Sequence, residues 1–362
     1  MAKPLITERA PAGTPVLYFA AASAEESDAV GQIPAAHRRS GPPPVPALDE
    51  ATLRAHFADL AALAPTPWPG DAAAARAATL AGLSHLHPRQ PAPTVQGALE
   101  VIHEVTRALA AITGLDRFSL QPPTLAAAER AALLVARASS QRLEPARIEV
   151  AAPAGSSVLA QAADLGLVPR PFARLESGDV DLESLDAAAG PATAAVAASW
   201  LTPSGAFERN LSGAAAVAHA CGALFCVDAT GLAALVGRTR LREADADIAW
   251  LSLRELCPAA SGAALGVRSA LTEKLPSPLV GKQRGGYELD DELPGTIGPL
   301  ALAPADLASA LAVYVALQVL GEEGLRERAE RIVLQANALA REGQEGGRQG
   351  ARRILLTTER ST

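Results

Sequence analysis

Amino groups able to form imines with carbonyl compounds are scarce in this sequence. Only three lysines occur among its 32 basic residues, Lys3, Lys274 and Lys282, and none lies between the first two. A lysine amine can hold a carbonyl compound as a Schiff base. Lys274 and Lys282, however, border a stretch punctuated by proline and glycine, residues 275–281, which is typical of a surface connection. We therefore expect both to be solvated surface lysines.

Hydroxyl and imidazole side chains form no recognisable catalytic or metal-binding pattern. Ser156-Ser157 and Thr202-Pro203-Ser204 supply hydroxyls, but no histidine lies at a spacing that would activate one as a nucleophile. Of His85, His87 and His103, only the first two are close in sequence, and on a loop they need not converge on an ion. The sequence predicts neither a hydrolase nor a metal site.

Cysteines and glycines also lack the spacing of binding motifs. Cys221, Cys226 and Cys257 are odd in number and lie in apolar surroundings, so we expect buried, inert thiols in a reducing compartment. The glycine-containing loop of residues 281–286 lacks the strand and helix flanks of a phosphate-binding loop. We interpret it as a flexible turn.

Composition indicates a folded protein without polyanionic partners. Hydrophobic residues make up 49% of the chain, which excludes disorder throughout. The net charge of −7 gives no attraction for nucleic acid, and no segment clusters basic residues with aromatics. The N-terminal residues do not follow a signal-peptide pattern, and the longest apolar stretches, such as 214–227, are too short to cross a bilayer. We expect a cytoplasmic protein with no nucleic-acid or membrane partner.

Short apolar runs alternate with helical patterns along the middle of the chain. A stripe of apolar residues from Val95 to Ile112, capped by Thr94 and ended by Gly114, predicts one helix. Further helices are predicted over 156–165, 182–188 and 212–221, and strands over 147–151, 168–173, 193–199, 223–228, 248–253 and 263–267. Because parallel strands need long crossovers, this alternation favours an α/β fold with a mostly parallel sheet covered by helices on both faces.

Breakers and periodicity divide the whole chain into five segments. We expect an extended N-terminal arm, a helical N-terminal segment that includes a short helix over 71–83, a large α/β domain, a long helical segment that is one helix or two joined at Gly321, and a disordered tail. Their predicted bounds are 1–48, 49–92, 93–303, 304–341 and 342–362.

Collinear motifs over residues 48–340 resemble the P-protein of the glycine cleavage system, in the cofactor-carrying second subunit of its two-chain form. The matching segments are His87-Pro88, Val95–Glu100, Leu109–Asp116, Ser119–Pro122, Gly178–Leu185, Gly205–Glu208, Ala223–Asp228, Leu251–Leu253, Gly321–Arg326 and Ala336-Asn337.

This resemblance implies a fold-type-I pyridoxal phosphate transferase architecture, with the site at the carboxyl ends of the strands and near a subunit interface. Family members decarboxylate glycine on the cofactor and pass the aminomethyl group to a lipoyl carrier protein. The family's small C-terminal domain has almost no counterpart after residue 341. A lysine that holds the cofactor as a Schiff base is essential to the family's chemistry.

That lysine has no counterpart in this chain. The family motif Leu-Asn-Leu-His-Lys-Thr-Phe is replaced by residues 251–257, so Glu255 takes the lysine position. A carboxylate forms no imine and repels a phosphate. The resemblance also places Thr124–Glu129 at the phosphate-binding segment, with only the glutamate kept, and Gly155 at the position of the histidine that stacks on the cofactor ring. Trp200 and Leu201 replace an asparagine and a proline.

Asp228 is the one cofactor-binding element that the resemblance retains. It ends an apolar strand and matches the aspartate that pairs with the pyridinium nitrogen. Alternatively, an aspartate at a strand end simply caps the following turn. We therefore regard Asp228 as a vestigial cofactor-binding residue, and we predict no catalytic residues.

The sequence favours a non-catalytic relative of the P-protein that serves as a scaffold or partner subunit and binds no cofactor. The alternative is a glycine dehydrogenase (decarboxylating) subunit that retains pyridoxal phosphate or acts with a partner chain. A degenerating gene product is a third interpretation. The resemblance implies a homodimer or a heteromer with a P-protein-like chain, and possibly contact with a lipoyl carrier protein.

Overall fold

The computed structural model describes residues 68, 70–80, 82, 86, 90–140 and 148–345. The predicted N-terminal arm, the residues 49–67 that follow it and the predicted tail from residue 346 onward lie outside these ranges, as do His85 and His87. The described residues all belong to one compact unit.

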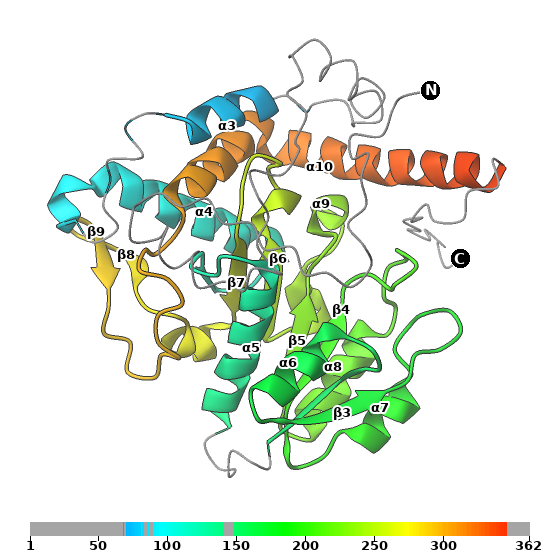
Figure 1. Ribbon diagram of the computed structural model, residues 1–362. Helices are drawn as coiled ribbons and strands as arrows, with labels where there is room; N and C mark the ends of the chain where they lie inside the picture. Colours follow the sequence, from blue (N-terminus) through cyan, green and yellow to red (C-terminus); the bar gives the residue numbers. More distant parts are fainter. Residues whose placement is uncertain are drawn as a thin grey trace, which may run out of the picture. The chain divides into compact units, whose positions relative to one another are not determined.

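A seven-stranded sheet forms the centre of this unit, with the strand order β1-β7-β6-β5-β4-β2-β3 (Figure 1). The five strands β2 to β6 pair with one another in parallel, whereas β7 runs antiparallel to both β6 and β1. The bounds are Arg117–Ser119 (β1), Glu149–Pro153 (β2), Val168–Phe172 (β3), Thr193–Ser199 (β4), Leu224–Asp228 (β5), Ile248–Ser252 (β6) and Ala263–Val267 (β7). The six predicted strands correspond to β2 to β7.

Helices cover both faces of the sheet. Successive residues of a strand point to opposite faces, so each strand contributes to two separate apolar clusters. In β4, Val196 and Ala198 belong to one apolar cluster, and Ala195 and Ala197 belong to another. The first cluster includes α4, α8, α9 and α10, and the second includes α5 and α6. The helices are Asp71–Ala78 (α3), Gln96–Thr113 (α4), Leu125–Ser139 (α5), Ser157–Asp164 (α6), Leu182–Ala188 (α7), Leu211–Ala220 (α8), Leu232–Leu235 (α9) and Leu307–Glu345 (α10). The predicted fold class is confirmed.

The start of one helix differs from the prediction. Thr94 lies in a preceding 3-10 turn and does not cap α4, whose N-cap is Val95; Gly114 ends the helix with a φ of +78°, as predicted. Helix α5 begins where the resemblance placed a phosphate-binding segment. The Thr124 side chain caps it by accepting a hydrogen bond from the Ala127 N–H at 3.1 Å.

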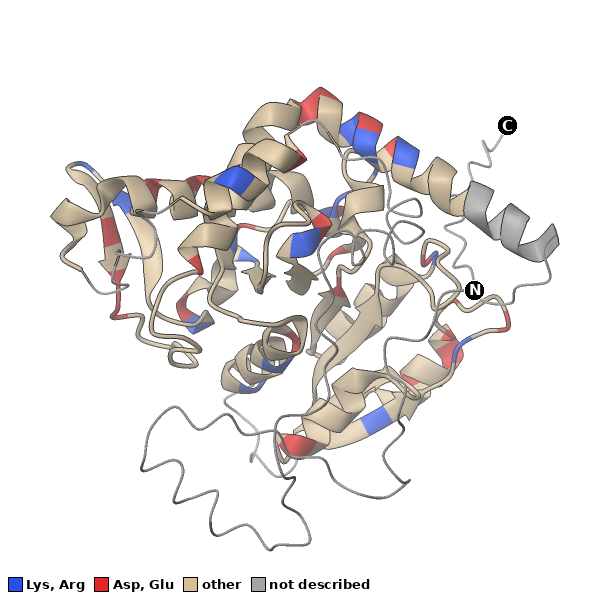
Figure 2. Ribbon diagram, turned by 45° about the horizontal axis from the view of Figure 1, so that its top comes forward, with Lys and Arg blue, Asp and Glu red and all other residues tan. Residues whose placement is uncertain are grey.

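The long C-terminal helix α10 is interrupted at Gly321, where φ is +59° and ψ is −170°. It continues to Glu345, so the predicted tail begins as helix. By length and composition alone the part from Leu307 to Asn337 could cross a membrane, and 33% of its apolar window is buried inside the structure. Ala312 and Val313 are among the fully buried residues of this helix. Acidic and basic residues alternate along the helix beyond Gly321 (Figure 2).

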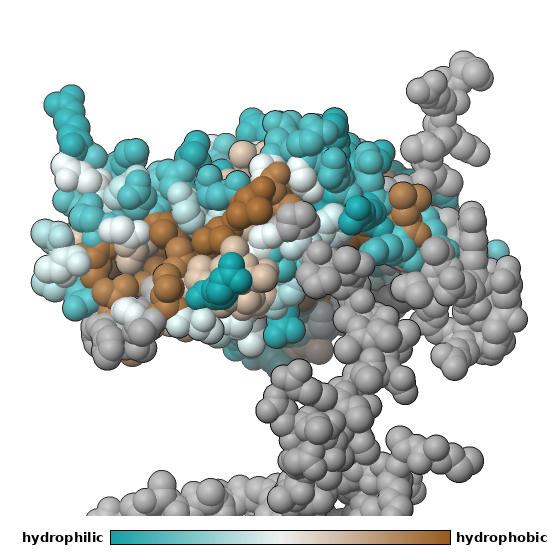
Figure 3. Space-filling model, turned by 90° about the horizontal axis from the view of Figure 1, so that it is seen from above, coloured by the Kyte–Doolittle hydropathy of each residue, from teal (hydrophilic) through white to brown (hydrophobic). Residues whose placement is uncertain are grey.

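A two-stranded sheet, β8 (Leu279–Gln283) and β9 (Gly286–Asp290), corrects the interpretation of residues 281–286 as a flexible turn. Gln96 of α4 anchors it, since its side chain accepts from the Tyr287 N–H and donates to the Tyr287 carbonyl, at 2.8 and 2.7 Å. Exposed apolar residues include Leu80 and Val319, and Figure 3 shows a band of apolar surface on the face seen from above.

Candidate functional site

Two acidic residues lie at the carboxyl ends of neighbouring parallel strands. Asp228 is the last residue of β5, and Glu255 ends the 3-10 turn Leu253–Glu255 (η6) that follows β6. Because β5 and β6 pair in parallel, both residues lie at the same edge of the sheet. In open α/β sheets this is the edge at which ligands bind.

The carboxylate of Glu255 is hydrogen bonded to the backbone on both oxygens. Oε1 accepts from the Gly231 N–H and Oε2 from the Ala233 N–H, each at 3.2 Å. Burial raises the pKa of Glu255, nearby Asp228 adds to the rise, and the two hydrogen bonds and Arg328 oppose it. The acid at the lysine position therefore holds the turn between β5 and α9.

Asp228 caps the same turn. Its Oδ1 accepts hydrogen bonds from the Thr230 N–H at 3.0 Å and from the Thr230 hydroxyl at 2.7 Å. Burial raises the pKa of Asp228, and both hydrogen bonds from Thr230 oppose that rise. This geometry is the turn-capping arrangement that an aspartate adopts at a strand end.

Glu129, the retained acid of the former phosphate segment, is buried on α5. Its carboxylate accepts from the Ser157 hydroxyl at 2.9 Å and from the Gln161 amide at 3.0 Å, both on α6. Burial raises the pKa of Glu129, and Asp228 contributes to the rise. Gly155, before α6, has a φ of +79° and no atom within 4 Å of where a side chain would begin. The site thus gathers negative charge and offers no stacking group at position 155.

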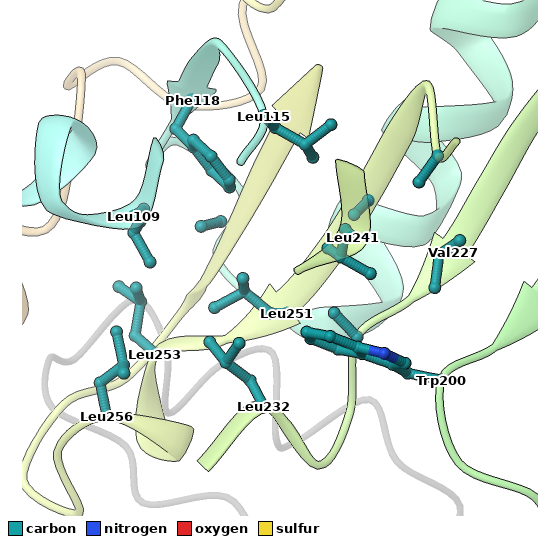
Figure 4. Close-up of a cluster of buried hydrophobic side chains, with 14 of the residues drawn as sticks. Leu109, Leu115, Phe118, Trp200, Val227, Leu232, Leu241, Leu251, Leu253 and Leu256 are labelled. Carbon is teal, nitrogen blue, oxygen red and sulfur yellow. The ribbon is translucent and has the colours of Figure 1, made fainter. Parts of the chain in front are cut away.

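Trp200 and Leu201 fill space at the carboxyl ends of β4 and β5. Trp200 is fully buried, and Figure 4 shows its indole among apolar side chains that include Leu232 and Leu251. Leu201 lies against Gly231, where an added Cβ would be 2.3 Å from Leu201 Cδ1. The indole N–H of Trp200 has no hydrogen-bond partner in the described part of the chain. Large apolar side chains therefore occupy the two positions that the resemblance matches to an asparagine and a proline.

A buried arginine that sequence analysis missed faces Glu255. Arg328 of α10 is 6% exposed, donates to the Leu256 carbonyl and lies over the ring of Trp68 at 5.9 Å. Burial lowers its pKa, while Asp71, Cys257 and Glu255 act in the opposite direction. Its neighbours in sequence are mostly charged and exposed, so no sequence signal indicates that this arginine is buried.

Neither described lysine is placed to replace the missing amine. Lys282 lies on β8 with its Nζ 5.4 Å from the centre of the Tyr287 ring, and Lys274 ends a 3-10 turn (Ser269–Lys274, η7) beside Gly295. The charged groups acting on Glu255 are Asp228 and Arg328, and no lysine is among them.

The remaining candidate residues do not assemble into a second site. His103 contacts the Tyr287 ring at 5.3 Å between ring centres. Thr202 and Ser204 hydrogen bond to each other at 2.9 Å. Ser156 Oγ is buried without a partner in the described part of the chain.

The three cysteines form no disulfide, and one of them is less buried than predicted. Cys226 and Cys257 are buried, and burial raises the pKa of both thiols. Cys221 is only half-buried and donates to the Ala218 carbonyl.

A histidine–aspartate pair, also missed in the sequence, lies at the opposite edge of the sheet. His219 Nε2 is 2.7 Å from Asp247 Oδ2, which also accepts from the Phe225 N–H at 2.8 Å. Asp247 immediately precedes β6, so the pair lies at the amino ends of the strands. It is therefore remote from Asp228 and Glu255 and belongs to the packing of α8.

Comparison with solved structures defines the class of protein. The chain is similar to glycine decarboxylase (P-protein) of the glycine cleavage system, with a TM-score of 0.60 and 23% identity over 90% of this chain and 78% of that one. It also resembles a cysteine desulfurase from Escherichia coli, with a TM-score of 0.56 and 17% identity over 83% and 78%. The chain has the fold of the pyridoxal phosphate-dependent transferases.

Sequence relatives narrow this class. The chain is 34% identical over 271 residues to a probable glycine dehydrogenase (decarboxylating) subunit 2 from Thermococcus gammatolerans, covering 72% of this chain and 54% of the relative. A protein of the same description from Coxiella burnetii is 33% identical over 280 residues, 74% and 57% of the two chains. No protein-family model matches. The chain is a relative of glycine dehydrogenase (decarboxylating) subunit 2, and it spans little more than half the length of these proteins.

The described residues do not fit pyridoxal phosphate as its family would hold it. Position 255 offers a carboxylate that is already bonded to Gly231 and Ala233, and position 155 offers no ring. Glu129 and Asp228 match acids that the family keeps, so the misfit lies at positions 255 and 155. We derive no chemical step through this cofactor.

Proposed function

We propose that this chain is a non-catalytic relative of glycine dehydrogenase (decarboxylating) subunit 2 that acts as a scaffold or partner subunit. The observation that carries the proposal is the Glu255 carboxylate, which occupies the lysine position and bonds to Gly231 and Ala233. The core supports a maintained fold, since both faces of the sheet are packed with fully buried side chains. Random decay would damage the core and the site alike.

The proposed role requires a partner chain. The relatives are named as second subunits, which supports a heteromer with a P-protein-like chain, and a homodimer is the other arrangement we propose. Contact with a lipoyl carrier protein and a cytoplasmic location complete the proposal. The tagged full chain is co-expressed with the products of the genes adjacent to its own and purified. The mass of the purified complex then distinguishes a heteromer from a homodimer.

Reduction with borohydride tests the absence of a Schiff base. The purified full chain is mixed with pyridoxal phosphate and treated with borohydride, and we expect low labelling spread over several amines. In a double variant, Lys274→Arg and Lys282→Arg, only the labelling of Lys3 and the N-terminus should remain. Stoichiometric labelling of a single lysine, together with absorbance of a protein-bound imine, would overturn the proposal.

The retained Asp228 favours one alternative, a glycine dehydrogenase subunit that retains pyridoxal phosphate or completes its site with a partner chain. Its carboxylate lies at the carboxyl end of β5, where a ligand of this fold class binds. Exchange of labelled bicarbonate into glycine tests this alternative, first with the isolated chain and then with the co-purified complex. Activity that disappears in Asp228→Asn would establish the alternative, whereas no exchange in either sample supports the non-catalytic role.

A further inference from the structure

The turn that joins β5 to α9 is fastened by side-chain carboxylates at three backbone positions. Asp228 accepts the N–H of Thr230, and Glu255 accepts the N–H groups of Gly231 and Ala233. Asp228 belongs to the turn itself, but Glu255 reaches it from the end of the next strand. The second contact therefore links two segments that are more than 20 residues apart.

Packing leaves this turn little freedom to move. Gly231 has a φ of +97°, a backbone conformation that side chains other than glycine rarely adopt. Leu201 lies directly on it, since an added Cβ would come within 2.3 Å of Leu201 Cδ1. The N–H groups of Gly231 and Ala233 are bonded to the Glu255 carboxylate.

The charges around Glu255 come from several elements. Asp228 on β5 repels it, and Arg328 on α10 attracts it. Asp228 in turn raises the pKa of Glu129 on α5. Arg328 also donates to the carbonyl of Leu256, next to Glu255. The arginine therefore holds the end of β6 and offsets the acidic charge at the same time.

We propose that Glu255 is a strap, a side chain that ties the β5–α9 turn to the end of β6 through its two backbone hydrogen bonds. The inference rests on the proposed function, because it requires that residue 255 anchors no cofactor. Glu255 then has a structural role of its own in this chain and does not merely mark the loss of the lysine. Lysine at this position cannot accept the two amide hydrogens, so Glu255→Lys releases the turn.

Amide hydrogen exchange and thermal unfolding of the full chain test the strap. Glu255→Gln keeps the shape of the side chain but leaves only one accepting oxygen, and Glu255→Lys leaves none. We expect exchange in the peptide covering residues 229–235 to be about 10-fold faster in Glu255→Gln than in the natural chain. Glu255→Lys is expected to lower the Tm by about 4 °C or more. Glu273→Ala, at an exposed glutamate, is the matched control.

Two outcomes would overturn the strap. One is unchanged exchange of residues 229–235 in Glu255→Gln, and the other is a Glu255→Lys chain as stable as the Glu273→Ala control. If Glu255→Lys does not fold, exchange in Glu255→Gln still decides. Failure of the strap and failure of the proposed function give different results. Cofactor trapped on the natural chain would refute the proposed function, but it would not change the exchange rates of the amides in residues 229–235.

Discussion

Replacing Asp228 by asparagine separates its two possible roles. In the structure, Asp228 Oδ1 accepts two hydrogen bonds from Thr230, at 3.0 and 2.7 Å. An asparagine oxygen can accept both, while the negative charge near Glu255 and Glu129 disappears. We therefore expect Asp228→Asn to be as stable as the natural chain or more stable at pH 8. Asp228→Ala loses both hydrogen bonds and is expected to cost roughly 1–3 kcal/mol.

Urea unfolding at pH 5 and pH 8 measures these effects. Burial raises the pKa of Asp228 in the folded chain above its unfolded value, so its favourable contribution is full at low pH and is lost as pH rises through the folded pKa. Asp228→Asn should therefore flatten the dependence of stability on pH. If Asp228→Asn is as unstable as Asp228→Ala at pH 8, the aspartate does not act as a turn cap.

Three further changes test the packing and charge of the same edge. Trp200→Ala should lower the free energy of unfolding by about 3–5 kcal/mol, because the side chain is fully buried. Trp68 is only half-buried, so Trp68→Ala should lower it less. Equal losses of free energy in urea unfolding would contradict the role of Trp200 in the core. Glu208→Ala should cost about 3 kcal/mol, because buried Glu208 accepts the N–H groups of Val180 and Asn210; a loss within the error of urea unfolding would disprove this. Burial raises the pKa of Glu129, so Glu129→Gln should weaken the fall in Tm as pH rises from 5 to 8, and a steeper fall would reverse the expected sign.

Much of the fold could be predicted from sequence because it depends on local patterns. The run that becomes β7 is apolar throughout, and the run that becomes β4 is apolar between Thr193 and Ser199, as expected for strands buried on both faces. Strand β1 is three residues long and leaves no comparable pattern. The hairpin of β8 and β9 contains glycines that suggested a loop, and its position depends on a distant contact with Gln96.

The site was predictable only as a set of changed residues. The sequence placed Glu255 at the lysine position, but its partners Gly231 and Ala233 depend on the pairing of β5 with β6. Arg328 is 72 residues from Leu256, whose carbonyl it binds. Such contacts follow from tertiary packing, so composition and periodicity cannot reveal them.

The most direct test is the mass of the full chain after incubation with pyridoxal phosphate and reduction with borohydride, alone and in complex with its co-purified partner. With a carboxylate at position 255, we predict no stoichiometric addition of one pyridoxyl phosphate group in either sample. A complete shift by one such group on this chain, mapped to a single lysine, would contradict the loss of the Schiff base.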